Sequence, residues 1–286
     1  AAIQLHETTG GRTAVASGDV RLGAGRAKLP AQGLEIHAQL EDLDLGRWLQ
    51  FAGTLDASGE SSLPRLHKLQ ARIDRLQAGP VALRQVALDL THRDRALSGT
   101  LSSNRFEGRA LIPDAPLQKP LVIELKRLEL EHLPGGSAAD DPEQQISSPL
   151  PTRLPALQLD VEQLQVNGHG MGKLQLHTSR LPNGLELQAL SLSGTGLLET
   201  AITGEWVLSS DGGERSAFDL SLKSDDLGRL ITTLGYARSI DKAPMEFAGQ
   251  LFWPGSPWQM NRANLSGQVN LRLEEGRLLQ IDSGDR

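Results

Sequence analysis

The sequence predicts an all-β fold of antiparallel strands with a few short helices. Three observations lead to this prediction. Apolar residues alternate with polar ones along most of the chain, turn-forming residues separate the alternating runs, and helical spacing occurs in only two short segments. Strands that follow one another without an intervening helix pair in the antiparallel sense.

The alternating runs begin early and continue almost to the end of the chain. In the first half they lie at residues 34–40, 86–90 and 106–112, and in the second half they recur between residues 157 and 273. In each run every second residue is apolar or glycine, which predicts strands with one apolar face.

Breaks in this alternation predict β-bulges. After Leu157, Leu159 and Val161, the pair Glu162-Gln163 shifts the pattern by one residue before Leu164 and Val166 resume it. One extra residue in an alternating run is typical of a bulge. The pattern shifts in the same way between Leu187 and Leu190.

Turn signals lie between the runs. Pro182-Asn183-Gly184 carries an Asn-Gly pair that favours a tight hairpin, and Asp211-Gly212-Gly213 is a second candidate. Trp253-Pro254-Gly255-Ser256 places Pro and Gly as a type II turn requires. These turns reinforce the prediction of antiparallel pairs.

Two helices are predicted, and they are copies of each other. Leu227, Leu230, Ile231 and Leu234 have helical spacing after an acidic cap and before Gly235, which predicts a helix near 225–234. Asp-Leu-Gly-Arg occurs there at 226–229 and again at 44–47, which predicts a second helix near 44–52. A second repeat relates residues 69–88 to 157–176. A unit of about 90 residues thus recurs, as in repeat proteins whose units stack.

The stretch at residues 134–153 interrupts the pattern. It is polar and rich in proline, so we expect a flexible loop there. It separates repeat units at 1–133 from repeat units at 154–286. The absence of an initiator Met and the abrupt start lead us to expect a section of a longer protein.

Composition excludes several function classes. The net charge of −6 disfavours nucleic acid as a partner, because such proteins neutralise phosphates with a basic surplus. The chain has no cysteine, so it has neither a disulfide nor a cysteine-ligated zinc site. No run of residues approaches the roughly 18 apolar residues that a membrane-spanning helix needs.

A search for catalytic or metal-binding motifs finds none that is specific. The seven histidines include no His-Glu-x-x-His pattern, and no Gly-x-Ser-x-Gly elbow occurs. The adjacent carboxylates Asp140-Asp141 and Asp225-Asp226 fall in the loop and at a helix cap. A carbohydrate-active enzyme would need stacked aromatics, yet aromatic residues make up 3% of the chain. We therefore predict no enzyme, no metal and no cofactor.

The sequence predicts too few helices to cover the apolar faces of the strands. They must either pack on each other as a closed β-sandwich or line a curved sheet with an apolar interior. An aliphatic lining of the second kind suits acyl chains, which need contact area rather than specific hydrogen bonds. The pattern leaves both alternatives open.

A resemblance favours the second alternative. Residues 247–258, followed by 265–271, 275–277 and 281–284, resemble the C-terminal region of the YhdP branch of the AsmA-like family of Gram-negative bacteria, with TamB as a more distant relative. The Asp-Leu-Gly-Arg helix and the strand at 202–206 are similar to that family as well. The resemblance implies a long curved antiparallel sheet that forms a hydrophobic groove, the repeating β-groove.

The resemblance also implies a function. The chain is expected to be a section of a periplasm-spanning conduit that moves phospholipid between the inner and outer membranes, without catalysis. An N-terminal helix outside this chain would tether it to the inner membrane, and its partners would be phospholipid acyl chains. The alternative is a periplasmic structural or adhesive β-protein with a closed, dry core. The candidate groove-lining residues are the alternating apolar residues of the second half: Leu157, Leu159, Val161, Leu164, Val166, Leu174, Leu176, Leu185, Leu187, Ile202, Trp206, Leu208, Phe218, Leu220, Leu222, Phe247, Leu251, Trp253, Leu265, Val269, Leu271 and Leu273.

Overall fold

The structure is a computed structural model that describes most of the chain. The described residues are 2–7, 13–23, 25–31, 33–48, 66–78, 81–131, 150–234, 236, 240–261, 263–274 and 277–278. They fall into two compact units, Ala1–Glu124 with Ile146–Pro149, and Leu125–Gln145 with Leu150–Arg286. The predicted loop at 134–153 lies outside the described residues as far as residue 149.

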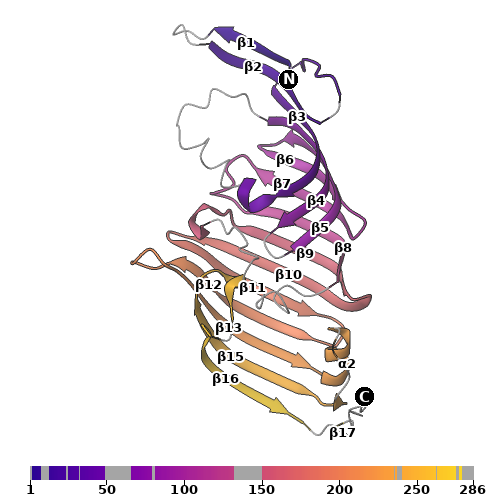
Figure 1. Ribbon diagram of the computed structural model, residues 1–286, viewed down its shortest axis with the longest axis vertical. Helices are drawn as coiled ribbons and strands as arrows, with labels where there is room; N and C mark the ends of the chain where they lie inside the picture. The colour runs from indigo at the N-terminus through magenta and orange to yellow at the C-terminus, as the bar shows by residue number, and fades with distance from the viewer. Residues whose placement is uncertain are drawn as a thin grey trace, which may run out of the picture. The chain divides into compact units, whose positions relative to one another are not determined.

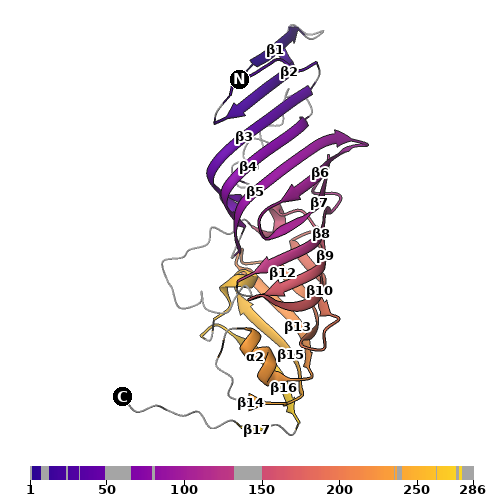
Figure 2. The same ribbon diagram turned by 90° about the vertical axis from the view of Figure 1, so that its right-hand side faces the viewer.

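The fold is all-β, as the alternating pattern predicts. The strands of the first unit are β1 (Ala2–Glu7), β2 (Thr13–Leu22), β3 (Gly33–Asp44), β4 (Leu66–Ala78), β5 (Val81–Arg93), β6 (Ala96–Ser102), β7 (Phe106–Pro113) and the start of β8 (Leu121–Leu130) (Figure 1 and Figure 2). Those of the second unit are the rest of β8, β9 (Leu157–Val166), β10 (His169–Leu181), β11 (Gly184–Ser193), β12 (Glu199–Leu208), β13 (Glu214–Ser224), β14 (Ile240–Asp241), β15 (Met245–Pro254), β16 (Ser266–Leu273) and β17 (Arg277–Leu278).

The strands are hydrogen-bonded in the order of the sequence. This order runs from β1 to β8 in the first unit and from β8 to β16 in the second, while β14 and β17 form a separate pair. Within the described residues the helical segments are α2 (Leu227–Thr233), the 3-10 turns η2 (Pro151–Arg153) and η3 (Pro257–Gln259), and residues 45–48. No helix in the described part of the chain has the length and hydropathy needed to cross a bilayer.

The prediction of antiparallel pairing throughout is wrong for two strand pairs of the first unit. β2 pairs with β3, and β3 with β4, in the parallel sense. Parallel strands need a connection that returns the chain to the same end of the sheet. The connections at 23–32 and 45–65 are longer than the hairpin turns and make this return possible. Alternation within a strand carries no information about its direction, so the sequence pattern did not reveal it.

The predicted bulges and the shared helix cap are present. In β9 the step from Val161 to Leu164 faces the shorter step from Gly172 to Leu174 in β10, so the extra residue lies at 162–163. The helix cap repeats at an offset of 182 residues. The Arg47 N–H donates to Asp44 Oδ1 at 3.0 Å, and the Arg229 N–H donates to Asp226 Oδ1 at the same distance.

The β10–β11 hairpin has the predicted tight turn. Gly184, however, is not one of the two loop residues of this turn. Leu181 pairs with Gly184, so Pro182 and Asn183 form the two-residue loop. Gly184 is the first residue of β11, where a Cβ would lie 2.2 Å from the Trp206 carbonyl oxygen. The glycine is therefore required by the close approach of β12 and not by a left-handed turn conformation.

Candidate functional site: the apolar face of the sheet

The strand registers of the second unit bring most of the candidate residues onto one face, which we call the apolar face. Its residues line up in rows that cross the strands. Row A is Val161, Leu174, Leu192, Thr200, Leu222, Phe247 and Leu271; row B is Leu159, Leu176, Leu190, Ile202, Leu220, Gly249 and Val269. Row C is Thr178, Leu187, Gly204, Phe218, Leu251 and Gly267; row D is Arg180, Leu185, Trp206, Ser216 and Trp253.

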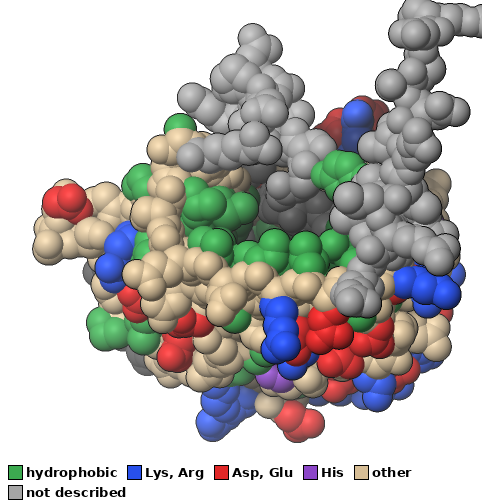
Figure 3. All heavy atoms as spheres, turned by 90° about the horizontal axis from the view of Figure 1, so that it is seen from below, with side chains coloured by type: hydrophobic (Ala, Val, Ile, Leu, Met, Phe, Trp, Pro, Cys, Tyr) green, Lys and Arg blue, Asp and Glu red, His purple; other side chains and the backbone are tan. Residues whose placement is uncertain are grey.

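The opposite face of the second unit is polar and carries paired charges. Asp160 accepts hydrogen bonds from Gln175 and His177, Arg215 pairs with Glu205 at 2.6 Å, and other pairs follow the same pattern. Figure 3 shows the result from the end of the second unit: hydrophobic side chains gather in a hollow, while acidic and basic side chains lie on the outside. The sheet thus separates an aliphatic surface from a charged one.

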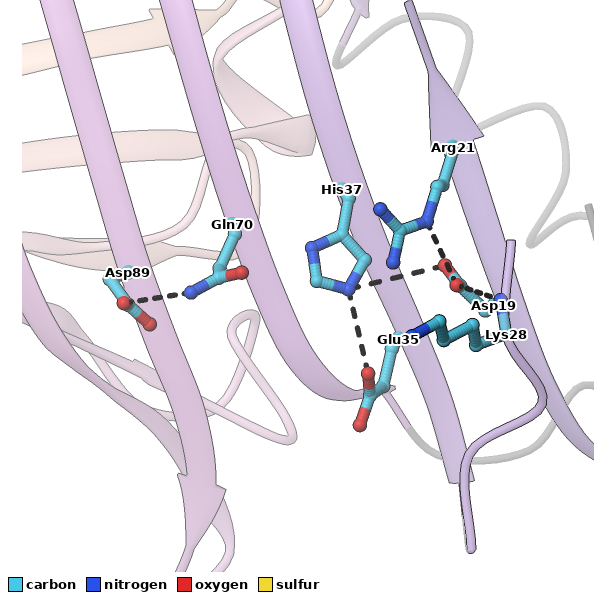
Figure 4. A network of polar contacts seen from close by, with 7 residues as sticks. All are labelled: Asp19, Arg21, Lys28, Glu35, His37, Gln70 and Asp89. Carbon is cyan, nitrogen blue, oxygen red and sulfur yellow. Dashed lines mark hydrogen bonds and ion pairs between the residues drawn. The ribbon is translucent and has the colours of Figure 1, made fainter. Parts of the chain in front are cut away.

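The first unit has the same separation. Val20, Ile36, Leu69, Leu90, Gly99 and Ala110 form one apolar row across its strands. The other face carries the polar contacts of Figure 4, in which Arg21 and His37 project toward Asp19, and Gln70 donates to Asp89 at 2.9 Å. The alternating runs of both halves therefore produce a sheet with two different faces.

Asp19 is the most buried charge of this polar face, with 1% of its surface exposed. Its Oδ2 accepts from Arg21 Nε at 3.0 Å and from the Lys28 N–H at 2.7 Å. Burial alone would raise the pKa of Asp19, but these hydrogen bonds and the charges of Arg21 and His37 outweigh it and lower the pKa. The carboxylate thus fastens the segment around Lys28 to β2, which is a structural task.

The apolar face is covered at one end by the segment that contains α2. Asn167 Nδ2 donates to the Thr233 carbonyl at 3.0 Å, which ties the helix to the β9–β10 turn. The Ser224 hydroxyl donates to the Leu197 carbonyl at 2.7 Å. The side chains buried at this end belong to Val161, Leu164, Val166, Met171, Leu192, Leu197 and Leu230. This end of the face is a packed core.

Tryptophans cover the opposite end. Trp206 and Trp258 make an edge-on contact with ring centroids 5.0 Å apart, and Trp253 stacks on Phe218 at 5.3 Å. The indole N–H of Trp206 donates to Glu214, and that of Trp253 donates to the Ser256 carbonyl. Trp206 and Trp253, which make these ring contacts, are both buried. The turn at 254–260 therefore closes this side of row D.

Between these two ends the apolar face is only partly covered by described residues. Leu159, Leu176, Leu190, Ile202 and Leu220 of row B are all half-buried. On β16, Val269 is 58% exposed and Leu271 54%. The middle of the face is thus an aliphatic surface that the described part of the chain covers only in part.

Hydroxyl groups on the apolar face are tied to the main chain. Thr178 donates to the Leu157 carbonyl, Thr200 to the Leu190 carbonyl, and Ser216 to the Gly255 carbonyl. Their hydroxyl hydrogens are therefore used by main-chain carbonyls of the protein itself. What remains on the face is suited to hydrocarbon and not to a polar ligand.

The candidate residues therefore fall into three environments. Val161, Leu164, Val166, Trp206 and Trp253 are packed in the covered ends, and Leu265, Val269, Leu271 and Leu273 are exposed on or beside β16. The others are half-buried: Leu157, Leu159, Leu174, Leu176, Leu185, Leu187, Ile202, Leu208, Phe218, Leu220, Leu222, Phe247 and Leu251. Sequence reasoning missed Leu190 and Leu192 as members of the face, although the shift before them was visible. It also missed Arg180, which ends an otherwise apolar series.

The described residues contain no cluster of three or more His, Asp or Glu side chains arranged to hold a metal ion. His177, 3.1 Å from Asp160, lies on the polar face of the second unit, and His37 lies beside Asp19 on that of the first. There they form part of the charge pattern of the sheet surface.

Comparison with known proteins gives a consistent family match. A family model described as YhdP protein matches residues 1–285. A similar relative is the "Intermembrane phospholipid transporter YhdP" of Escherichia coli (strain K12), which is 27% identical over 93 residues. That match covers 32% of this chain and 7% of the relative. No solved structure matches the chain.

Proposed function

Because the chain belongs to the YhdP family, we propose that its apolar face is a section of a lipid conduit. In this proposal acyl chains of phospholipid lie on rows A to C, and the head groups stay in water at the rim. The conduit moves phospholipid across the periplasm between the inner and outer membranes, and a segment outside this chain tethers it to the inner membrane. The chain catalyses no reaction. The printed name of the E. coli relative supports transport between membranes.

One observation carries the proposal. Rows A to C form an aliphatic surface several strands wide, half-buried over most of its area, packed at Val161 and Leu192 and exposed on β16, and the hydroxyls within it are bonded to the main chain. Contiguous apolar patches larger than a few hundred Å² are rare on proteins that act alone in water, and they mark interaction surfaces. A surface without directional polar groups favours a hydrocarbon ligand.

The energetics suit a passive conduit. Removing each CH₂ group of an acyl chain from water is worth about 0.8 kcal/mol. Neighbouring strands lie about 4.8 Å apart, so a lipid that moves along row B from β9 to β13 meets a leucine or isoleucine side chain at each step. Since successive contacts resemble one another, no single position binds the chain far more tightly than the next.

Site-specific photo-crosslinking tests the proposal. Ile202 and Ala201 are adjacent in β12 and lie on opposite faces, with Ile202 in row B and Ala201 exposed on the polar face. A photoreactive phenylalanine analogue at each position should give phospholipid adducts at 202 and none at 201, as measured by mass spectrometry after irradiation in cells.

The rival with a closed, dry core makes the opposite prediction. It gives no adduct at either position, or equal adducts at both, and the rest of the chain would then cover row B. Lipid extracted from the purified parent chain provides an independent count of bound phospholipid. Lipid-free protein with no adduct at 202 would overturn the proposal.

A further inference from the structure

Arg180 is an exception on the apolar face. It pairs with Leu185, which pairs with Trp206, so its side chain belongs to row D. Among the described residues of β9 to β16, it is the one basic side chain at a position of this face. The one acidic residue at such a position, Glu214, accepts the Trp206 N–H. A cation among aliphatic and aromatic neighbours calls for an explanation.

The partners of Arg180 are neutral. Its Nη1 donates to the Leu154 carbonyl, and its Nη2 donates to the Thr152 carbonyl at 2.9 Å. No carboxylate of the described residues forms an ion pair with it. A guanidinium has five N–H donors, so within the described residues the two carbonyls leave some of these donors unused and the positive charge without an ion pair. Charges that leave water are usually paired, so the lack of an ion pair to Arg180 among the described residues is informative.

The position of Arg180 in the sheet fits the rim of a groove. The residue lies directly before Leu181, whose pairing with Gly184 closes the β10–β11 hairpin, so the face ends there. In the opposite direction along β10 come Thr178 of row C and Leu176 of row B. At about 3.3 Å per residue, Leu176 is about 13 Å from Arg180 along the strand. A charged group held at Arg180 would therefore place attached hydrocarbon on rows B and C.

We infer that Arg180 holds the phosphate of a glycerophospholipid whose acyl chains occupy rows B and C. This inference rests on the proposed function and adds a head-group contact to it. The planar guanidinium donates paired hydrogen bonds to phosphate oxygens, a geometry that lysine lacks. The carbonyls of Thr152 and Leu154 orient the guanidinium toward the rim and leave its remaining donors for the lipid. Lipids with the same acyl chains but no phosphate lose this contact.

The test compares two lipids with identical oleoyl chains, dioleoyl phosphatidylglycerol and dioleoylglycerol, on the delipidated chain. The parent should retain the phospholipid in preference to the diacylglycerol. Arg180→Gln, which keeps hydrogen-bond donors for the two carbonyls, should bind the phospholipid about tenfold more weakly and the diacylglycerol as before. Arg180→Lys should be intermediate.

Arg215→Gln is the matched control, because Arg215 lies near the same end of the strands but on the polar face, paired with Glu205. It should leave both affinities unchanged. Equal phospholipid binding by the parent and Arg180→Gln would overturn the inference while leaving the conduit intact. Loss of both lipids together with a lower melting temperature would show that Arg180 only anchors residues 152–154. A parent that binds neither lipid would overturn the proposed function itself.

Discussion

A glutamate in the middle of row B distinguishes an open lipid surface from a dry core. Leu220 lies near the centre of β13, paired with Ile202 on one side and Gly249 on the other, and its side chain is half-buried. Leu159 and Leu176 lie in the same row and are also half-buried. Leu220→Glu places a carboxylate where the structure leaves the face uncovered by described residues.

The two arrangements predict different stability losses. Full burial of a leucine side chain is worth about 1.5–3 kcal/mol, so a half-buried leucine contributes about 1–2 kcal/mol. If the face is open, the new carboxylate reaches water, and the loss of stability is limited to this contribution of the leucine. That loss is well below a total stability of about 5–15 kcal/mol. If the face is closed and dry, an unpaired carboxylate adds several kcal/mol, and the protein unfolds.

Lipid binding should respond more strongly than stability. Losing the burial of two methylene groups weakens binding by about 1.6 kcal/mol, which is more than tenfold. The assay is circular dichroism melting together with the phospholipid retained after purification. Ser221→Glu, which charges the opposite face of the same strand, should keep both properties. Unfolding of the glutamate variants at all three leucines, or normal lipid in all three, would refute the open-face interpretation.

Three further predictions concern the scaffold. Gly184→Ala should lower the free energy of unfolding by about 1–3 kcal/mol in urea titration, because the new Cβ meets the main chain of β12; a neutral result would contradict the close approach. Asp226→Ala should cost about 1 kcal/mol by removing the cap of α2, and an unchanged urea midpoint would show that the cap is unimportant. The lowered pKa of Asp19 contributes stability that is fully present above about pH 4 and is lost as the pH falls through that lowered pKa. Melting temperatures from pH 6 to pH 3 should therefore fall more steeply in the parent than in Asp19→Asn, and parallel curves would count against this linkage.

Local features of the fold could be predicted because their causes are local. The bulge at Glu162-Gln163 shows as one extra residue between apolar positions, and the structure has its register shift there. The cap of α2 depends on Asp226 and a main-chain N–H three residues later, all within one turn. In such cases neighbouring residues supply the whole physical reason, and the sequence shows them side by side.

Strand direction and surface coverage could not be predicted, because they depend on residues far apart in the sequence. The alternation within β3 is the same whether its neighbours run parallel or antiparallel, so it does not reveal the parallel pairing of β3 with β2 and β4. Trp258 contacts Trp206 although more than 50 residues separate them in the sequence, and this contact depends on the tertiary fold. The position of Arg180 beside Leu185 on the apolar face likewise follows from the register of several strands, which no single run reveals.

The gradient of burial along row A explains how one alternating pattern can form both a packed core and the proposed lipid-binding surface. Val161, at the β9 end where α2 is anchored, is 2% exposed, and Leu192 is 5% exposed. Leu271, in the same row on β16, is 54% exposed. Since these positions carry the same kind of side chain, the difference comes from what covers them and not from the pattern itself. The covered end supplies the hydrophobic stabilisation that holds the sheet together, which leaves the uncovered strands free to expose an aliphatic surface that would be costly without a hydrocarbon ligand.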